Sequence, residues 1–182
     1  MLYMFLAEGF EETEAIGCLD VIRRAGIAIK TVGINGKTVQ GSHGISVVAD
    51  IEKNEIDFDN MQGVILPGGM PGTENLENDA DVIKAIKFCA DKGLLIGAIC
   101  AAPMVFGRLG LLMGKKAVCF PGFEEYLEGA EVKTDFCVTD GNIITAKGAG
   151  VAMIFGARIV DYFADGEGEK LLRQMQHLRM EG

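Results

Sequence analysis

Short apolar runs alternate with segments of helical periodicity along this chain. Apolar runs bounded by glycine, proline or polar turns are typical of strands that are buried on both faces. The pattern predicts strands at residues 2–6, 28–34, 64–66, 94–99, 117–120, 136–139 and 143–146. Apolar positions spaced three or four residues apart predict helices at residues 12–25, 79–92, 105–109, 151–163 and 169–178.

Turn signals and one helix face refine this outline. Asn35-Gly36 and Asp140-Gly141-Asn142 have the composition of hairpin turns. Residue 39 and residues 45–48 fit the strands of a small antiparallel flap. The first predicted helix carries one apolar side, formed by Ile16, Leu19 and Ile22.

Continuous apolar strands between helices indicate an α/β fold with a mostly parallel sheet that helices cover on both faces. The chain has no linker, repeat or low-complexity segment, so we expect a single domain over residues 1–182. Ligands bind such sheets at the carboxyl ends of the strands. Four loops should meet at that edge: residues 8–14, 67–73, 100–103 and 147–150.

The charge balance narrows the range of partners. The chain has 26 acidic and 17 basic residues and a net charge of −9. Nucleic acids and anionic membrane surfaces both require a positive face, so neither is expected to bind. Residues 1–7 lack the basic flank of a signal peptide, and the apolar stretch at 94–107 is too short to span a bilayer. We therefore expect a cytoplasmic protein.

Cysteine usage points to thiols rather than disulfides or metal. The five cysteines are an odd number and are widely scattered, so reduced thiols are expected. No pair has zinc-binding spacing and the chain has two histidines, so we expect no metal site and no cofactor. Four cysteines are interpreted as structural, two in predicted helices and two in predicted strands: Cys18, Cys89, Cys119 and Cys137.

Cys100 is the exception, because it stands between a predicted strand and a predicted helix. Its neighbours Ala101 and Ala102 are small, as a tight strand-to-helix turn requires, and Pro103 suits a first helical turn. Unpaired amides at a helix N-terminus lower the pKa of a thiol. Cys100 is thus a candidate nucleophile, and the alternative is a buried structural cysteine.

Two further groups should reach the same edge of the sheet. Gly68 and Gly69 follow a strand and can aim backbone N–H groups at a developing oxyanion, although they also fit an ordinary turn. Glu11 and Glu12 fit the usual preference for acids in a first helical turn. Glu14 is a candidate proton carrier, because a carboxyl close to a thiolate has a raised pKa.

Four segments in this order carry a family resemblance: AEGFEETE at 7–14, LPGG at 66–69, AICAAP at 98–103 and KGAG at 147–150. Together they resemble the DJ-1 branch of the ThiJ/PfpI superfamily, over essentially the whole chain. The resemblance implies a flavodoxin-like three-layer sandwich and a homodimer. It also implies an oxidation-sensitive nucleophile, Cys100, hydrogen-bonded to a protonated Glu14. An anion pocket would be formed by the backbone of Gly68, Gly69 and Ala101, and the pocket lining would include Gly148, Gly150 and Phe120.

Members of that family are described as glutathione-independent glyoxalases, as deglycases of methylglyoxal-modified proteins and nucleotides, and as redox-responsive chaperones. The partner implied for this chain is therefore a small α-oxoaldehyde or a glycated adduct. Two rival hypotheses remain: a non-enzymatic oxidative-stress sensor whose Cys100 becomes a sulfinate, and a protein of thiamine thiazole-phosphate biosynthesis. The last has least support, because the sequence places no evident basic residue beside the pocket.

One departure from the family pattern affects the chemistry. Human-type members place a histidine before the proline after the next strand, and the related peptidases place one directly after the cysteine. Those positions are Phe120 and Ala101 here, and neither His43 nor His177 lies in a matching motif. The departure argues against protease activity and favours a Cys-Glu site over a Cys-His couple. It also favours the sensor hypothesis, because sensing needs no general base.

Overall fold

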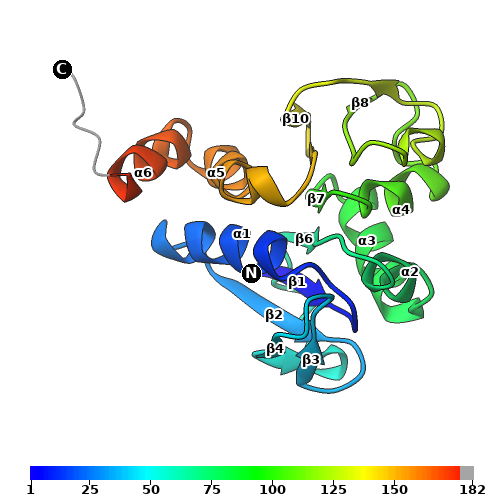
Figure 1. The fold of residues 1–182 in the computed structure, drawn as a ribbon, viewed down its shortest axis with the longest axis vertical. Coiled ribbons are helices and arrows are strands. Elements are labelled where there is room, and N and C mark those ends of the chain that lie inside the picture. The colour runs from blue at the N-terminus through cyan, green and yellow to red at the C-terminus, as the bar shows by residue number, and fades with distance from the viewer. Residues whose placement is uncertain (177–182) are drawn as a thin grey trace.

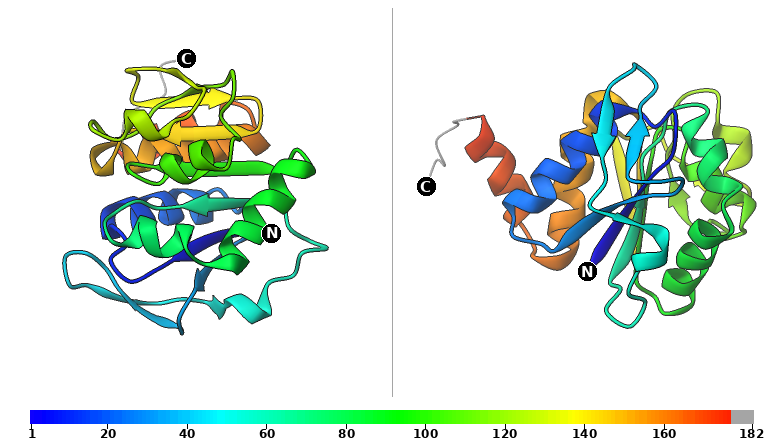
Figure 2. Two further views of the ribbon diagram at one scale, coloured as in Figure 1. Left: turned by 90° about the vertical axis from the view of Figure 1, so that its right-hand side faces the viewer. Right: turned by 90° about the horizontal axis from the view of Figure 1, so that it is seen from below.

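A computed structural model describes residues 1–176 and has three layers, a central sheet with helices on both faces (Figures 1 and 2). The sheet has seven strands in the order β10-β11-β7-β6-β1-β2-β5. Neighbouring strands are parallel except β10 and β11, so the predicted fold class is confirmed. The strands are β1 Leu2–Leu6, β2 Ile29–Gly33, β5 Ile51–Glu52, β6 Gly63–Leu66, β7 Leu95–Ile99, β10 Cys137–Asp140 and β11 Ile143–Ala146.

The helices divide into two groups, one on each side of the sheet. In the right-hand view of Figure 2 the sheet is seen between α1, α5 and α6 on one side and α2, α3 and α4 on the other. The first group consists of α1 Glu12–Arg24, α5 Ala152–Phe163 and α6 Glu167–Met175. The second group consists of α2 Gly72–Glu77, α3 Ala80–Asp91 and α4 Pro103–Arg108.

Strand β1 shows why both faces need a helical cover. Side chains alternate along a strand, and every residue of β1 is apolar and buried. Met4 packs into the apolar core beneath α1 and α5, whereas Phe5 packs into the core on the side of α3 and α4. An apolar run without alternation therefore produces a strand that needs a layer of helices on each side.

Two short ladders lie outside the main sheet. The predicted flap is formed by the antiparallel strands β3 Thr38–Gln40 and β4 Ser46–Val48. The second ladder pairs β8 Lys116–Ala117 with β9 Glu131–Val132. The hairpin expected at Asn35-Gly36 was wrong, because β2 lies in the main sheet and β3 pairs with β4. The chain turns there, but it leaves the sheet instead of folding back along β2.

The strand expected at 117–120 was also wrong beyond Ala117, and Cys119 lies outside any strand. The amide of Val118 donates to the side-chain Oγ1 of Thr145 (3.0 Å), and the amide of Phe120 donates to the carbonyl of Cys100 (2.8 Å). Backbone groups used in this way cannot form a regular ladder. This irregular segment therefore runs from the sheet edge to the Cys100 loop.

Helix boundaries and faces show three further differences. Ile16 is 40% exposed, because α1 buries the side formed by Ala15, Cys18, Leu19 and Ile22 instead. Helix α2 begins at Gly72, within the segment expected to be a loop. The last helix begins at Glu167, before the predicted start at 169, and its predicted end at 178 lies outside the described residues.

The chain adds β2 on one side of β1 and β6 on the other, so the sheet has a topological switch point at β1. From β1 the chain passes through α1 to β2 on one side, and β6 then pairs on the other side of β1. Such a switch point opens a crevice at the carboxyl ends of the strands. The loops after β1, β6 and β7 meet at this crevice, as predicted.

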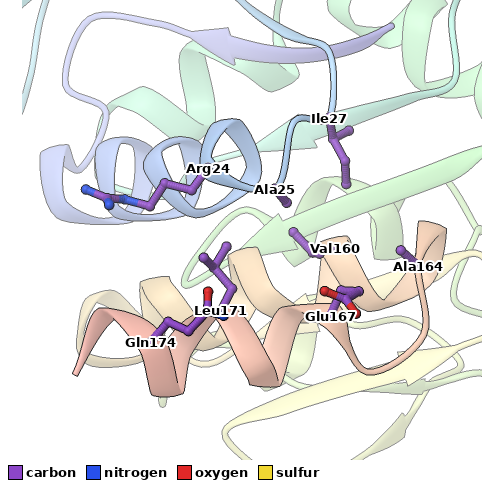
Figure 3. A pocket seen from close by; sticks show the side chains of 8 residues that line it. All are labelled: Arg24, Ala25, Ile27, Val160, Ala164, Glu167, Leu171 and Gln174. Atoms are coloured by element: carbon purple, nitrogen blue, oxygen red, sulfur yellow. The ribbon is translucent and has the colours of Figure 1, made fainter. Parts of the chain in front are cut away.

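A pocket between α1, α5 and α6 lies away from the carboxyl ends of the strands. Figure 3 shows a pocket of about 240 Å³ between the last turn of α1, the end of α5 and α6, lined in part by Arg24, Val160 and Leu171. It lies at the opposite end of α1 from Glu14 and so is separate from the crevice. No helix within residues 1–176 is both long enough and apolar enough to cross a membrane.

Candidate active site

Cys100 follows β7 directly and has an unusual backbone conformation. Its φ of 65° makes it the one non-glycine residue with positive φ among residues 1–176. Side chains with a Cβ rarely adopt this region, and it costs about 1–3 kcal/mol unless the surroundings hold it. Two hydrogen bonds hold it here: the Cys100 amide donates to the carbonyl of Ala146 (2.9 Å), and its carbonyl accepts from Phe120. The predicted tight turn at the cysteine is present.

Glu14 and Cys100 meet across Gly68. The buried carboxylate of Glu14 accepts the amide of Gly68 at 2.8 Å and lies close enough to the Cys100 thiol for each group to shift the pKa of the other. A Cβ atom on Gly68 would stand 2.6 Å from Cβ of Cys100 and 2.7 Å from Oε2 of Glu14. Real side chains do not approach so closely, so this position accommodates only glycine. The ends of β1, β6 and β7 thus bring the acid, the spacer and the thiol together.

The Cys100 sulfur also lies within reach of two backbone donors. The amides of Gly69 and Ala101 act on the thiol and oppose the rise of its pKa. Gly69 has a φ of 87°, and a Cβ there would stand 2.6 Å from both the amide nitrogen of Glu11 and the carbonyl oxygen of Gly9. The structure therefore places the five predicted residues Glu14, Gly68, Gly69, Cys100 and Ala101 in one cluster.

Burial dominates the electrostatics of this pair. It raises the pKa of Glu14 to about 7, helped by the charge of Glu11 and opposed by hydrogen bonds from Cys100 and Gly68. Burial also raises the pKa of the Cys100 thiol to about 12, and the neighbouring Glu14 charge adds to that rise. Because two negative charges in contact are disfavoured, the pair carries at most one negative charge near neutral pH.

The lowered thiol pKa expected from a helix N-terminus was therefore wrong. Helix α4 is short and begins at Pro103, three residues after the cysteine. Its influence is smaller than burial and the adjacent carboxylate, although the Gly69 and Ala101 amides act in the lowering direction. The Cys100 thiol can therefore ionise near neutral pH only when Glu14 is protonated.

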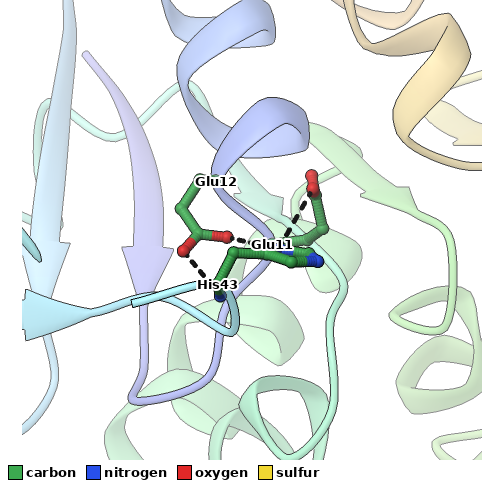
Figure 4. A group of neighbouring side chains, drawn as sticks. All are labelled: Glu11, Glu12 and His43. Atoms are coloured by element: carbon green, nitrogen blue, oxygen red, sulfur yellow. Dashed lines mark hydrogen bonds and ion pairs between the residues drawn. The ribbon is translucent and has the colours of Figure 1, made fainter. Parts of the chain in front are cut away.

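Glu11 and Glu12 do more than complement the helix dipole. Glu11 caps α1 by accepting the amide of Glu14 at 2.6 Å. Glu12 ties the flap to α1, because it accepts the His43 amide at 2.8 Å and contacts His43 Nδ1 at 3.0 Å (Figure 4). Its carboxyl lies directly over Gly41, where a Cβ would overlap it. Sequence reasoning missed this tie, because residues 12 and 43 are brought together only by the folded flap.

The contact between Glu12 and the flap shifts the pKa values of both Glu12 and His43. Burial opposes ionisation of Glu12, but hydrogen bonds from His43 and Ile45 outweigh it and lower the pKa of Glu12 to about 2. The same contact raises the pKa of His43. Ligand atoms of Glu11, Glu12 and His43 lie within 4.8 Å of one another. Since the Glu12 oxygens already accept four contacts from residues 42–45, we interpret the group as an anchor for the flap.

No histidine is among the groups that influence the Cys100 thiol within residues 1–176. His43 belongs to the flap anchor just described, and His177 lies outside the described residues. The acid at the sulfur is Glu14. The chemistry that this arrangement supports is nucleophilic addition by a thiolate, with a carboxylic acid as proton donor and two amides for an oxyanion.

A groove of about 300 Å³ is lined by residues 120–121, residue 136 and residues 147–151, and the Phe120 amide in its wall donates to the Cys100 carbonyl. It brings together the three predicted pocket residues Phe120, Gly148 and Gly150. Lys147 also lines it, so the expectation of no basic residue beside the pocket was wrong. The remaining lining residues come from the same two segments and from Phe136: Pro121, Ala149, Val151 and Phe136.

Comparisons with known proteins agree with this fold and cover the site. The DJ-1/PfpI family model matches residues 1–162. The Arabidopsis thaliana protein DJ-1 homolog B is 38% identical over 86% of this chain, and the match spans 36% of its own length. The Caenorhabditis elegans glutathione-independent glyoxalase DJR-1.2 is 29% identical over 88% of this chain and 86% of its own. The solved structure of oxidised Toxoplasma gondii DJ-1 superposes with a TM-score of 0.91 at 28% identity, covering 98% of each chain.

The raised pKa of Glu14 predicts a pH-dependent contribution to stability. The folded-state pKa of about 7 exceeds the ordinary value of 4.5 for a glutamate, so the folded state favours the protonated acid. The stabilisation is complete below pH 4.5 and is lost as pH rises through about 7, amounting at most to about 3 kcal/mol. Urea unfolding between pH 4.5 and 8 should show that Glu14→Gln removes this fall. Exposed Glu128→Gln is the control, and equal pH dependence of wild type and Glu14→Gln would contradict the assignment.

Proposed function

The chain belongs to the DJ-1/PfpI family, and from that premise we propose that it is a reactive-cysteine enzyme acting on small α-oxoaldehydes without glutathione. The observation that carries the proposal is the close approach of Glu14 and Cys100 across Gly68, with the backbone amides of Gly69 and Ala101 beside the same thiol. The nematode relative named as a glutathione-independent glyoxalase supports the same reaction class. Adducts of methylglyoxal with proteins or nucleotides present a related carbon centre and are the second substrate class.

The reaction starts from the tautomer in which Glu14 is protonated and Cys100 is the thiolate. The sulfur adds to the aldehyde carbon, and the oxygen that becomes negative is stabilised by the Gly69 and Ala101 amides. Glu14 gives its proton to this oxygen, which completes the hemithioacetal, and becomes a carboxylate. The carboxylate then takes the proton from the former aldehyde carbon and delivers it to the neighbouring carbonyl carbon, while the hydroxyl proton passes to the neighbouring oxygen, which converts the hemithioacetal into a thioester. Water hydrolyses the thioester, so the net change is oxoaldehyde plus water to hydroxy acid.

The absence of a histidine at residue 120 sets the expected rate. A second base near the oxyanion typically contributes about 10²–10⁴-fold in acid-base catalysis. With Phe120 in that place, Glu14 must perform both proton transfers alone. We therefore expect turnover, but slower than in members that carry the histidine.

Lactate formation from methylglyoxal tests the enzyme proposal. Cys100→Ser should lower kcat/KM by at least about 10²-fold, because the serine hydroxyl is a much weaker nucleophile. Glu14→Gln should also lower it, and Phe120→His should raise it by adding a base at the groove. Cys137→Ala, at a strand position in the sheet, is the control and should retain activity. Equal turnover by wild type and Cys100→Ser excludes Cys100 as the nucleophile.

A second candidate function is a sensor of oxidants, supported by the similarity to the oxidised Toxoplasma gondii protein. The thiolate of Cys100 would be oxidised to a sulfinate, whose oxygens accept hydrogen bonds from Glu14 and the two amides. The thiazole-phosphate hypothesis has weaker support. Glu11, Glu12 and Glu14 surround the crevice with carboxylates, and Lys147 is the one basic residue lining the groove within the described chain.

Mild peroxide treatment followed by intact mass and peptide mapping tests the sensor function. The expected result is addition of two oxygen atoms to Cys100, abolished in Cys100→Ser. Glu14→Gln should slow the reaction, since the acid no longer exchanges its proton with the thiol. Addition of oxygen to other cysteines or to methionines first would exclude Cys100 as the sensing residue.

We also propose that two copies of the chain associate through α1 and the flap. Ile16 on α1 and Ile45 and Val48 on the flap are 40%, 60% and 72% exposed, an unusual concentration of apolar surface on so acidic a chain. Light scattering should give the mass of a dimer. Ile16→Glu should shift it to a monomer by placing charges against each other, whereas Met113→Glu, an exposed position after α4, should not. A monomeric wild type excludes the dimer.

A further inference from the structure

Glu12 is an ionised carboxylate that is only 6% exposed, and its side-chain partners lie in the turn between β3 and β4 of the flap. An acid in a first helical turn complements the helix dipole while it remains in water, so its place in α1 does not explain this burial. A buried charge needs hydrogen bonds that offset its lost hydration. Ser42, His43 and Ile45 supply them, and Figure 4 shows the Glu12 carboxyl turned toward His43. The burial of Glu12 therefore serves its contact with the flap.

The flap is bonded in turn to the segment that precedes α1. The amide of Gly9 donates to the carbonyl of Gln40 (2.8 Å), and the amide of Ser42 donates to the carbonyl of Phe10 (2.8 Å). Phe10 also forms a parallel β-bridge with Gly41. The Phe10 side chain is fully buried, so this short ladder is fixed to the core. Glu12 comes two residues after Phe10 and binds the same turn of the flap a second time.

The segment before α1 is bonded to the turn after β6 as well. The amide of Glu11 donates to the carbonyl of Gly68 (2.9 Å), while the amide of Gly68 donates to the carboxylate of Glu14 (2.8 Å). Gly69 lies so close that an added Cβ would stand 2.6 Å from the carbonyl oxygen of Gly9. Because the segment is bonded both to the flap and to this turn, a displacement of the flap would pass to Gly68 and so to the Glu14 carboxyl.

We propose that Glu12 is a positioning residue, which holds the Glu14 carboxyl beside the Cys100 thiol by fixing the flap against the segment before α1. This inference rests on the proposed function, because it assigns a further residue to the same site. Glu12 acts through the backbone: within residues 1–176, the titratable groups that shift the pKa of Glu14 are Glu11 and Cys100. Removing the Glu12 carboxylate therefore changes the position of Glu14 and leaves the charges that act on it in place.

The rate at which iodoacetamide alkylates Cys100, measured by peptide mapping between pH 5 and pH 9, tests this role. In wild type the rate should rise with pH and reach a plateau that begins near the Glu14 pKa of about 7, because a pair with one negative charge keeps a constant share of thiolate. Glu14→Gln should remove the plateau. Glu12→Gln should move its start at least about one pH unit lower, because a Glu14 carboxyl that water reaches ionises more readily.

Gly41→Ala is a second variant, and it keeps the Glu12 charge. An added Cβ would overlap the Glu12 carboxyl, so this substitution should displace the carboxyl and shift the start of the plateau in the same direction. Asp20→Asn is the matched control, because it removes an acid of the same helix that pairs with Arg24 at the surface. It should keep the wild-type profile. Circular dichroism shows whether each variant is folded.

The pH at which the plateau starts separates positioning from shielding. A flap that only covered the sulfur would change the rate by the same factor at every pH and leave this start unmoved. A wild-type profile without the plateau, or a folded Glu12→Gln or Gly41→Ala variant that keeps the wild-type start, overturns the proposal. Alkylation needs no turnover, so a shifted profile without lactate formation contradicts the enzyme proposal alone.

Discussion

The close approach of Glu14 and Cys100 across Gly68 is the constraint on which the rest of the site depends. A glycine after β6 leaves room for the carboxyl from α1 and the thiol from the end of β7 to meet, and an added Cβ would fall on both. The three groups come from three different strand ends, so the contact requires the strand order β7-β6-β1. The positive φ of Cys100 makes the tight turn that follows β7. The contact between Glu14 and Cys100 thus requires the strand order, the turn at Cys100 and the glycine at residue 68 together.

The same contact allows at most one of the two groups, Glu14 or Cys100, to be negatively charged. Burial raises the pKa of both groups, and their proximity prevents both from ionising together. A thiolate at Cys100 therefore requires a neutral Glu14 beside it, and the amides of Gly69 and Ala101 favour the thiolate by lowering its pKa. Around this pair, Glu11 caps α1 and Glu12 holds the flap, so the acidic segment after β1 also fixes the position of Glu14.

The sequence predicted this site well where local pattern and local chemistry coincide. The runs that became β1, β6 and β7 are apolar and end in turn residues, so the edge at which Glu14, Gly68 and Cys100 meet followed from the parallel-sheet rule. Prediction failed where a backbone group bonds a distant partner. Val118 and Phe120 give their amides to Thr145 and Cys100, which removes the strand expected there. Ile16 has the right spacing for the core, but the orientation of α1 against α5 leaves it outside.

By itself the sequence determined the fold class, the edge of the sheet that carries the candidate site, and the choice of Cys100 and Glu14 as its candidate residues. These follow from periodicity and from residue types, which local interactions set. Only the tertiary structure decided the protonation balance of the pair, the tie between Glu12 and His43, and the groove formed by Phe120 and Phe136. Each of these depends on how deeply a group is buried or on which distant segment lies against it. A burial energy and a contact between residues 31 positions apart have no signature in the order of the amino acids.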